Sequence, residues 1–186
     1  QYSPLAAMTA SSGDGSLLLP VHGLGTEYIA VGRPEGRTIT STRTRASVTV
    51  VATAAGTQLT LIPSVEIDAG EDLGSLSVGQ QTLVPLQPHQ VLHLTTMSEG
   101  GDLSGTLIYA SQPVAVFAGH EADRGAAPVP VQAPGDHLED ALRPVSAWGR
   151  VHVAVKTSPP KGPSDGLIIV ASEDDTLVQF DPPIHQ

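Results

Sequence analysis

Residues 48–63 read V-T-V-V-A-T-A-A-G-T-Q-L-T-L-I-P, and this stretch decides the fold class. Two runs of β-branched and aliphatic residues flank a short stretch of small residues that includes Gly56. Such runs favour extended strands, and glycine readily adopts the positive φ that a tight turn requires. The stretch therefore predicts a strand, a tight turn and a second strand, which together form a β-hairpin.

A second stretch of the chain repeats this pattern. Residues 167–182 read L-I-I-V-A-S-E-D-D-T-L-V-Q-F-D-P, and an alignment without gaps places Thr176 on Thr57. Asp174-Asp175 then stands at the turn, where the first copy has Gly56, and it meets the same need for positive φ. The two stretches are therefore interpreted as two copies of one structural unit.

Each copy is preceded by a Pro-x4-Gly turn and a short apolar run. Pro20 and Gly25 precede E-Y-I-A-V, whereas Pro144 and Gly149 precede V-H-V-A-V. The repeat predicts two related halves, with units that start near residues 16 and 144. The second unit has no counterpart of residues 72–120. Either the chain was cut short, or the missing strands come from elsewhere, which includes strand pairing with other parts of the same protein.

Further short strands are expected on both sides of the deciding stretch. Their even spacing and the frequent Gly and Pro favour one antiparallel, β-sandwich-like domain over residues 16–186, after a linker-like segment at 1–15. The full set of expected strands is 17–19, 26–31, 38–42, 47–53, 58–62, 82–86, 90–95, 105–109, 114–118, 151–157, 167–171 and 177–180.

One segment predicts a helix inside a long connection. Asp136 is a suitable N-cap, and Glu139 follows it three residues later as in a capping box. Leu138 and Leu142 are four residues apart and would share one helix face. Pro144 would end the helix, so about two turns are expected over residues 136–142.

The composition excludes several functions. The formal net charge of −10 argues against nucleic-acid binding and against an anionic membrane surface, since both attract Lys and Arg. The chain has no cysteine, so disulfides and cysteine-based catalysis are excluded. No apolar run approaches the ~20 residues that a membrane span requires, and no motif predicts a bound cofactor.

Residues 102–149 resemble a known family. They contain D-L-S-G-T-L-I-Y-A-S-Q-P-V-A-V-F-A-G-H and then G-D-H-L-E-D-A-L-R-P-V-S-A-W-G, and L-G-T-E-Y-I-A-V lies upstream. This order of motifs is similar to the N-terminal domain family of IgG Fc-binding proteins, including its bacterial members. The motif residues that carry the resemblance are Asp102, Gly105, Pro113, Gly119, His120, Asp136, His137, Pro144, Trp148 and Gly149.

The resemblance implies a secreted or surface protein, but no mapped Fc-binding motif is present. Family members usually carry cysteines after the Gly-His and before the Asp-His-Leu. Here those positions lie near Glu121 or Ala122 and at Gly135. Both cysteines are absent together, as expected if they form one disulfide in the relatives.

One cluster of His and carboxylate residues could carry chemistry. His120, Asp136, His137 and Glu139 flank the long connection, and such side chains are common zinc ligands. Their spacing matches no standard metal motif, so the preferred interpretation is structural: Asp136 caps the helix, His137 and Glu139 anchor the loop by hydrogen bonds, and His120 ends a strand. Tyr28 and Phe117 are expected in the core, and Trp148 is expected to pack in the core or at a half-buried position.

The sequence therefore predicts a non-catalytic binding or adhesion module outside the cell, with no cofactor and with a protein or glycan as partner. Two alternatives stay open. One is a metal-dependent hydrolase that uses His120, Asp136 and His137, and the other is a purely structural spacer.

Overall fold

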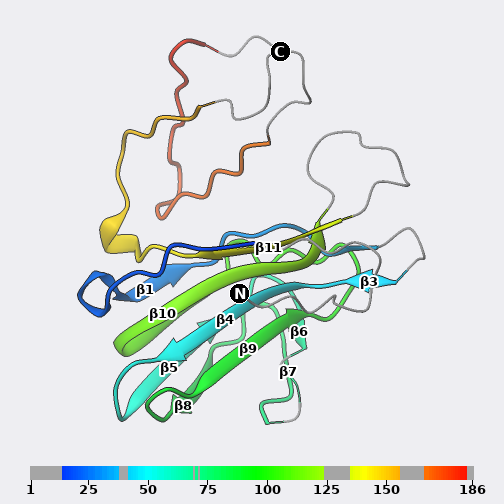
Figure 1. The fold of residues 1–186 in the computed structure, drawn as a ribbon, viewed down its shortest axis with the longest axis vertical. Helices are drawn as coiled ribbons and strands as arrows, with labels where there is room; N and C mark the ends of the chain where they lie inside the picture. The colour runs from blue at the N-terminus through cyan, green and yellow to red at the C-terminus, as the bar shows by residue number, and fades with distance from the viewer. Residues whose placement is uncertain are drawn as a thin grey trace.

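The computed structural model describes residues 14–37, 42–68, 70, 72–123, 135–155 and 166–183 (Figure 1). The described residues are almost entirely strand and loop, which confirms the all-β, antiparallel prediction. The elements are η1 (Val21–Gly23), β1 (Gly25–Ile29), β2 (Gly36–Arg37), β3 (Arg43–Thr44), β4 (Ala46–Ala52), β5 (Thr57–Ile62), β6 (Ile67–Asp68), β7 (Ser75–Leu76), β8 (Thr82–Leu86), β9 (Val91–Thr96), β10 (Leu107–Asp123), β11 (Asp136–Ala141) and η2 (Val145–Ala147).

Strand β10 is the central strand of the sheet. It has 17 residues, and other strands pair with both of its edges in antiparallel fashion. Along one edge, β4 pairs with its C-terminal part and β5 with its N-terminal part. Along the other edge, β11 and β1 take the corresponding places. β9 and β8 then pair with the outer edges of β4 and β5.

The predicted hairpin at residues 48–63 is wrong. β4 and β5 do not pair with each other, because both pair with the same edge of β10 and follow one another along it. The four residues between them form a turn with Gly56 at φ 69°, so the predicted turn conformation is confirmed. A long strand that offers backbone partners to both runs replaces the pairing that a hairpin would have provided.

The two strands expected at 105–109 and 114–118 are one strand. Pro113 lies between the part of β10 that pairs with β5 and the part that pairs with β4. Its missing N–H therefore removes no ladder hydrogen bond, and its carbonyl accepts a hydrogen bond from the Thr53 hydroxyl at 2.5 Å.

The sheet curls around one buried face, as in a nearly closed barrel. In β4, residues alternate strictly between buried and half-buried, which is the pattern of a strand with one face in the core. Val50 is fully buried and pairs with Val116 and Leu92 in neighbouring strands. Tyr28 is also fully buried, as predicted, and its hydroxyl donates to the Val114 carbonyl at 2.7 Å.

The predicted helix over residues 136–142 is wrong, because Asp136–Ala141 form strand β11. β11 pairs with β10 from Phe117 to Asp123, so a distant strand satisfies the backbone groups that a helix would have satisfied locally. Tertiary pairing of this kind overrides weak local preferences.

The outer edge of β11 is covered by side chains from the N-terminal segment. The amide of Glu139 donates to the Asp14 carboxylate at 2.8 Å, and the amide of Ala141 donates to the Ser16 hydroxyl at 2.6 Å. Unpaired amides on a strand edge can pair with another chain, and these two hydrogen bonds prevent such pairing at the outer edge of β11. Residues 1–13 lie outside the described residues, so the division into a linker at 1–15 and a domain at 16–186 stays a prediction.

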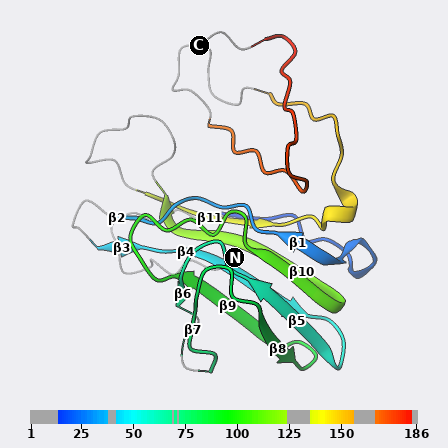
Figure 2. The same ribbon diagram turned by 180° about the vertical axis from the view of Figure 1, so that it is seen from behind.

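Several strands expected near the two ends are not formed. Residues 17–19, 151–155, 167–171 and 177–180 have no strand structure, and the rest of 151–157 lies outside the described residues. The strand expected at 38–42 also falls mostly outside them. Figures 1 and 2 show residues 166–183, in orange and red, as extended chain that stands off the sheet in both views.

Candidate binding surface

The outer face of the half-sheet formed by β9, β4, β10 and β11 carries an open depression of about 510 Å³. Strand register places its side chains in rows. Val91 and Val51 form one row, and His93, Thr49 and Phe117 form the next. These side chains lie opposite the core because successive residues of a strand point to opposite faces.

Gly119 forms part of the floor of this depression. A Cβ atom at this position would lie 2.9 Å from the Ser47 Oγ and 3.2 Å from the Leu138 carbonyl oxygen. The contact with Ser47 is closer than a Cβ atom tolerates and the contact with Leu138 is unusually tight, so glycine lets β4, β10 and β11 approach one another here. It also leaves the surface hollow between Phe117 and Glu121.

The sequence interpretation of Phe117 as a core residue is wrong. Phe117 is half-buried on the outer face, in line with Thr49 and Ala141. The available signal was alternation: Val114, Val116 and Ala118 occupy the buried positions, so Phe117 must point outward. An aromatic side chain on an outward position is a common anchor for a partner.

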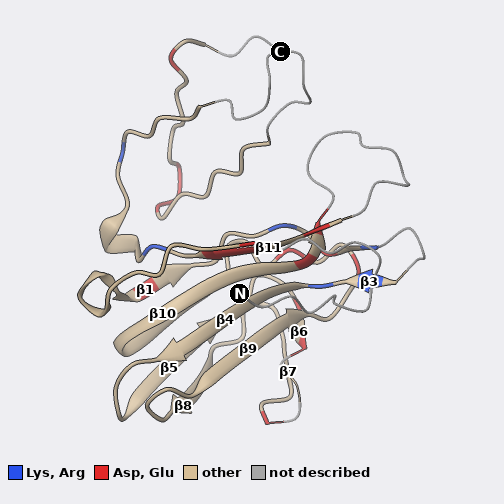
Figure 3. Cartoon of the chain, in the orientation of Figure 1, with Lys and Arg blue, Asp and Glu red and all other residues tan. Residues whose placement is uncertain are grey.

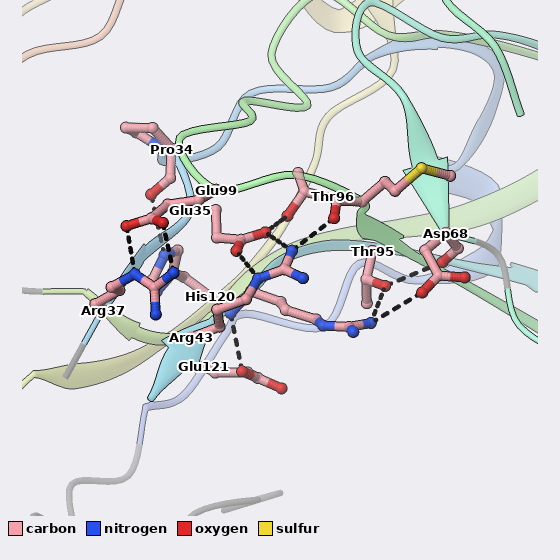
Figure 4. Close-up of polar contacts among 12 residues, drawn as sticks. Pro34, Glu35, Arg37, Arg43, Asp68, Thr95, Thr96, Glu99, His120 and Glu121 are labelled. Atoms are coloured by element: carbon pink, nitrogen blue, oxygen red, sulfur yellow. Dashed lines mark hydrogen bonds and ion pairs between the residues drawn. The ribbon is translucent and has the colours of Figure 1, made fainter. Parts of the chain in front are cut away.

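One end of the depression is polar (Figure 4). Arg45 donates through its amide to the Glu121 carboxylate at 2.8 Å. Its guanidinium lies 3.3 Å from Asp68 Oδ2 and 3.2 Å from the Thr95 hydroxyl. Figure 3 shows acidic residues along β11 and at the C-terminal end of β10, with basic residues at β3 and the start of β4. Charges of both signs therefore gather at this end of the depression, and Val51 and Val91 lie toward the other end.

His93 stands at the rim on β9. Its Nδ1 atom lies 2.8 Å from the Thr49 hydroxyl, so the ring is held against the neighbouring strand. Together with Thr49 and Thr95 it provides hydrogen-bonding groups beside the apolar side chains of Val51, Val91 and Phe117.

His120 is a structural residue that points away from solvent. Its Nδ1 accepts a hydrogen bond from the Ala122 amide at 3.1 Å, so its Nε2 carries the proton and donates to the Pro34 carbonyl at 3.1 Å. Burial lowers the pKa of His120 below its ordinary value, and the nearby Asp123 opposes this shift only in part. Both ring nitrogens are occupied, so this histidine is not free to bind a metal ion.

The other members of the suspected metal cluster do not converge on His120. Asp136 is exposed at the start of β11. His137 is buried, and its Nε2 lies 3.9 Å from Glu139 Oε2. Within the described ranges, no group of three or more His, Asp or Glu side chains comes together in a way that could hold a metal ion.

A buried carboxylate near this end of the sheet was missed by sequence reasoning. Arg43 donates twice to Glu35, at 2.5 and 2.8 Å, and the Thr96 hydroxyl donates to it at 2.5 Å. Burial alone would raise the pKa of Glu35, but these hydrogen bonds and the charge of Arg43 lower it below its ordinary value. The cluster joins the loop before β2 to β3 and β9, and nothing in the local sequence marks these residues as partners.

The remaining motif residues serve the fold. Asp102 accepts a hydrogen bond from the Ser104 amide at 2.8 Å, and Gly105 has φ 88°, so the two form the turn that leads into β10. Pro144 is buried against Gly25. Trp148 is half-buried, as expected, and its indole N–H donates to the Arg143 carbonyl at 3.1 Å. Gly149 is exposed.

The described chain thus defines a class: an all-β module with a curled 9-stranded sheet, a small 2-stranded sheet of β2 and β3, and an open, chemically mixed depression on the outer face of the large sheet. The chain belongs to the family whose model is described as IgGFc binding protein, which matches residues 14–186. A human protein named IgGFc-binding protein is 34% identical over 160 residues. These cover 85% of this chain but only 3% of the human protein.

No solved structure matches the chain. None of the helices in the described residues is long and apolar enough to cross a membrane.

Proposed function

We propose that this chain is a non-catalytic binding module of a secreted or cell-surface protein, and that it binds a protein partner through the depression on β9, β4, β10 and β11. The observation that carries the proposal is the set of outward-facing apolar side chains of Val91, Val51 and Phe117, which lie in two adjacent rows beside hydrogen-bonding and charged groups. An apolar centre with a polar rim is typical of protein–protein contact surfaces.

Family membership supports a binding role outside the cell. The human relative is named for binding the Fc part of IgG, which is an extracellular protein. This chain spans a small fraction of that relative, so binding of the relative's ligand is not assigned to this chain. IgG Fc is used only as one probe in the binding test.

The arrangement of side chains argues against the hydrolase alternative. A metal-dependent hydrolase would need His120, but both of its ring nitrogens bond to backbone groups. A metal site also requires its ligands to converge, and the exposed Asp136 lies at the end of β11.

A protein partner is favoured over a glycan. Sugar-binding surfaces usually rely on the rings of Trp, Tyr or Phe, and among the described residues Phe117 is the single one of these types that lines the depression. The mixed charges at the rim, with Arg45 and Glu121 side by side, suit the varied surface of a protein.

The test offers the whole chain a panel of purified extracellular proteins, with human IgG Fc among them, and a glycan array. We expect saturable binding of at least one protein, weakened about ten-fold or more by Phe117→Ser, because truncation of a hot-spot anchor costs about 2 kcal/mol or more and about 1.4 kcal/mol already corresponds to ten-fold. Tyr109→Ser is the matched control, since Tyr109 is an exposed aromatic residue of β10 outside the depression. Melting curves would verify that both variants fold.

Binding of glycans without any protein would contradict the proposal. So would equal effects of the Phe117 and Tyr109 substitutions, or hydrolysis of a bound molecule. A chain that binds no member of either panel would favour the structural-spacer alternative.

A further inference from the structure

Two short turns, far apart in the chain, have the same backbone conformation. Pro20 has φ −66° and ψ 152° before η1, and Pro144 has φ −62° and ψ 151° before η2. Each turn is closed by the same hydrogen bond, from Leu24 to the Val21 carbonyl at 3.2 Å and from Trp148 to the Val145 carbonyl at 3.0 Å. The two Pro-x4-Gly stretches of the sequence are therefore alike in structure.

The turns that follow them are also alike. The Thr57 hydroxyl donates to the carbonyl of Ala54 at 2.8 Å, and the Thr176 hydroxyl donates to the carbonyl of Glu173 at 2.7 Å. The residue before each threonine has positive φ, 69° in the first turn and 57° at Asp175 in the second. Residues 144–182 thus repeat both local turns of residues 20–63.

The apolar pattern repeats as well, but its surroundings do not. In the first unit Val48, Val50, Leu59 and Leu61 are buried in the core. The aligned residues of the second unit are Leu167, Ile169, Val178 and Phe180, which are 61%, 50%, 45% and 37% exposed. Side chains with the alternation of core residues therefore face solvent, which is unusual for an isolated folded chain.

The first unit shows what the second one lacks. β1 and the β4–β5 run never pair with each other; β10 lies between them and pairs with both. Residues 151–155 and 167–180 correspond to β1 and to β4–β5, and among the described residues no strand lies between them.

We propose that residues 151–155 and 166–183 dock one extended strand with the alternation of β10, supplied by a part of the same protein outside these 186 residues. The strand inserts between 151–155 and 167–180 as β10 does in the first unit. A second copy of this chain does not provide it, because each copy's β10 already has both edges paired. The human relative carries far more polypeptide than the matched segment, so a protein of this family has room for such a strand.

The test uses hydrogen exchange of the whole chain with a synthetic peptide that copies residues 107–123. We expect amides in 151–155 and 167–180 to exchange about ten-fold slower or more when the peptide is in excess, since paired strands are protected. The amides of β4 and β10 serve as the internal control, and their exchange rates are expected to be the same with and without the peptide. A scrambled peptide is expected to have no effect.

Two substitutions make the test specific. Ile169→Asp is expected to abolish the protection, because it aligns with the core-facing Val50. Leu177→Asp is the matched control, because Leu177 aligns with Gln58, which faces outward in β5, and protection is expected to persist.

Unchanged exchange in the presence of the peptide would overturn the proposal. It would also be overturned if both substitutions removed the protection equally, since that indicates unspecific apolar contact. Protection without peptide that rises with protein concentration would assign the surface to a second copy instead. Binding through the depression is measured separately with Phe117→Ser, so neither result depends on the other.

Discussion

Residues 20–63 and residues 144–182 carry the same pattern, yet one folds into the sheet and the other does not. Both begin with a proline-led turn, and both contain a threonine that closes a second turn through its hydroxyl. In the first region these turns join strands that flank β10, whereas in the second they join exposed extended chain. The comparison teaches that local turns form from local sequence, but strands need a partner.

The largest difference between the two regions is expected when the same substitution, an aliphatic residue to Asp, is made at aligned positions in each. Val50→Asp places a carboxylate in the core opposite Val116 and Leu92, and we expect it to lower the free energy of unfolding by about 3–5 kcal/mol. Ile169→Asp, at a half-exposed position, should change it by less than about 0.5 kcal/mol. Urea unfolding of both variants measures the difference. Similar losses would mean that the second region is packed as tightly as the first.

The two glycines that end the Pro-x4-Gly turns provide a second pair. A Cβ at Gly25 would lie 2.4 Å from the Pro144 Cβ, so Gly25→Ala should push η2 away from β1 and cost about 1–3 kcal/mol. At Gly149 the nearest atom would lie 3.7 Å away, so Gly149→Ala should be neutral within about 0.5 kcal/mol. Thermal melting compares them. A neutral Gly25→Ala would show that the two turns do not depend on the contact between them.

The smallest effect concerns pH. Burial lowers the pKa of His120, so the unfolded chain binds the proton more tightly than the folded chain. The free energy of unfolding should therefore fall as pH drops below about 6.5, by at most about 1.4 kcal/mol per pH unit, and this contribution should be complete above that pH. Urea unfolding between about pH 5 and 7.5 measures the slope.

The control for the pH effect comes from the second region. His120→Gln should make the slope shallower above pH 5, because the variant lacks this titrating ring. Part of the slope should remain, since burial also lowers the pKa of His93. His152→Gln, in the exposed region, should leave the wild-type slope unchanged. If the two variants behaved alike, the buried position of His120 would not be the cause.

The wrong helix prediction over residues 136–142 shows a limit of reasoning from local sequence. Asp136, Leu138 and Glu139 satisfy local rules for a helix, but they form β11 because β10 offers them an open edge. The hairpin predicted at residues 48–63 failed for the same reason, since β10 pairs with both of its strands. In each case the pairing partners lie between 13 and 74 residues apart along the chain, and local patterns contain no information about a partner at that distance.

The candidate surface was predicted only in part. Gly119 belongs to the motif that the sequence singled out, and the structure places it in the floor of the depression. Phe117 was assigned to the core, although the alternation of β10 puts it outside. Thr49 and His93 join it through the pairing of β4 with β9 and β10, which no single segment of sequence predicts.

By itself the sequence determined the all-β class, the family, and the turns at Gly56 and Asp175, since these depend on side chains and backbone angles within a few residues. Only the tertiary structure decided which strands pair. It also decided that Asp136–Ala141 form a strand and not a helix, and that His120 forms a hydrogen bond with the backbone carbonyl of Pro34. The physical reason is that a strand satisfies none of its backbone hydrogen-bonding groups within itself, so residues distant in the chain must supply the partners.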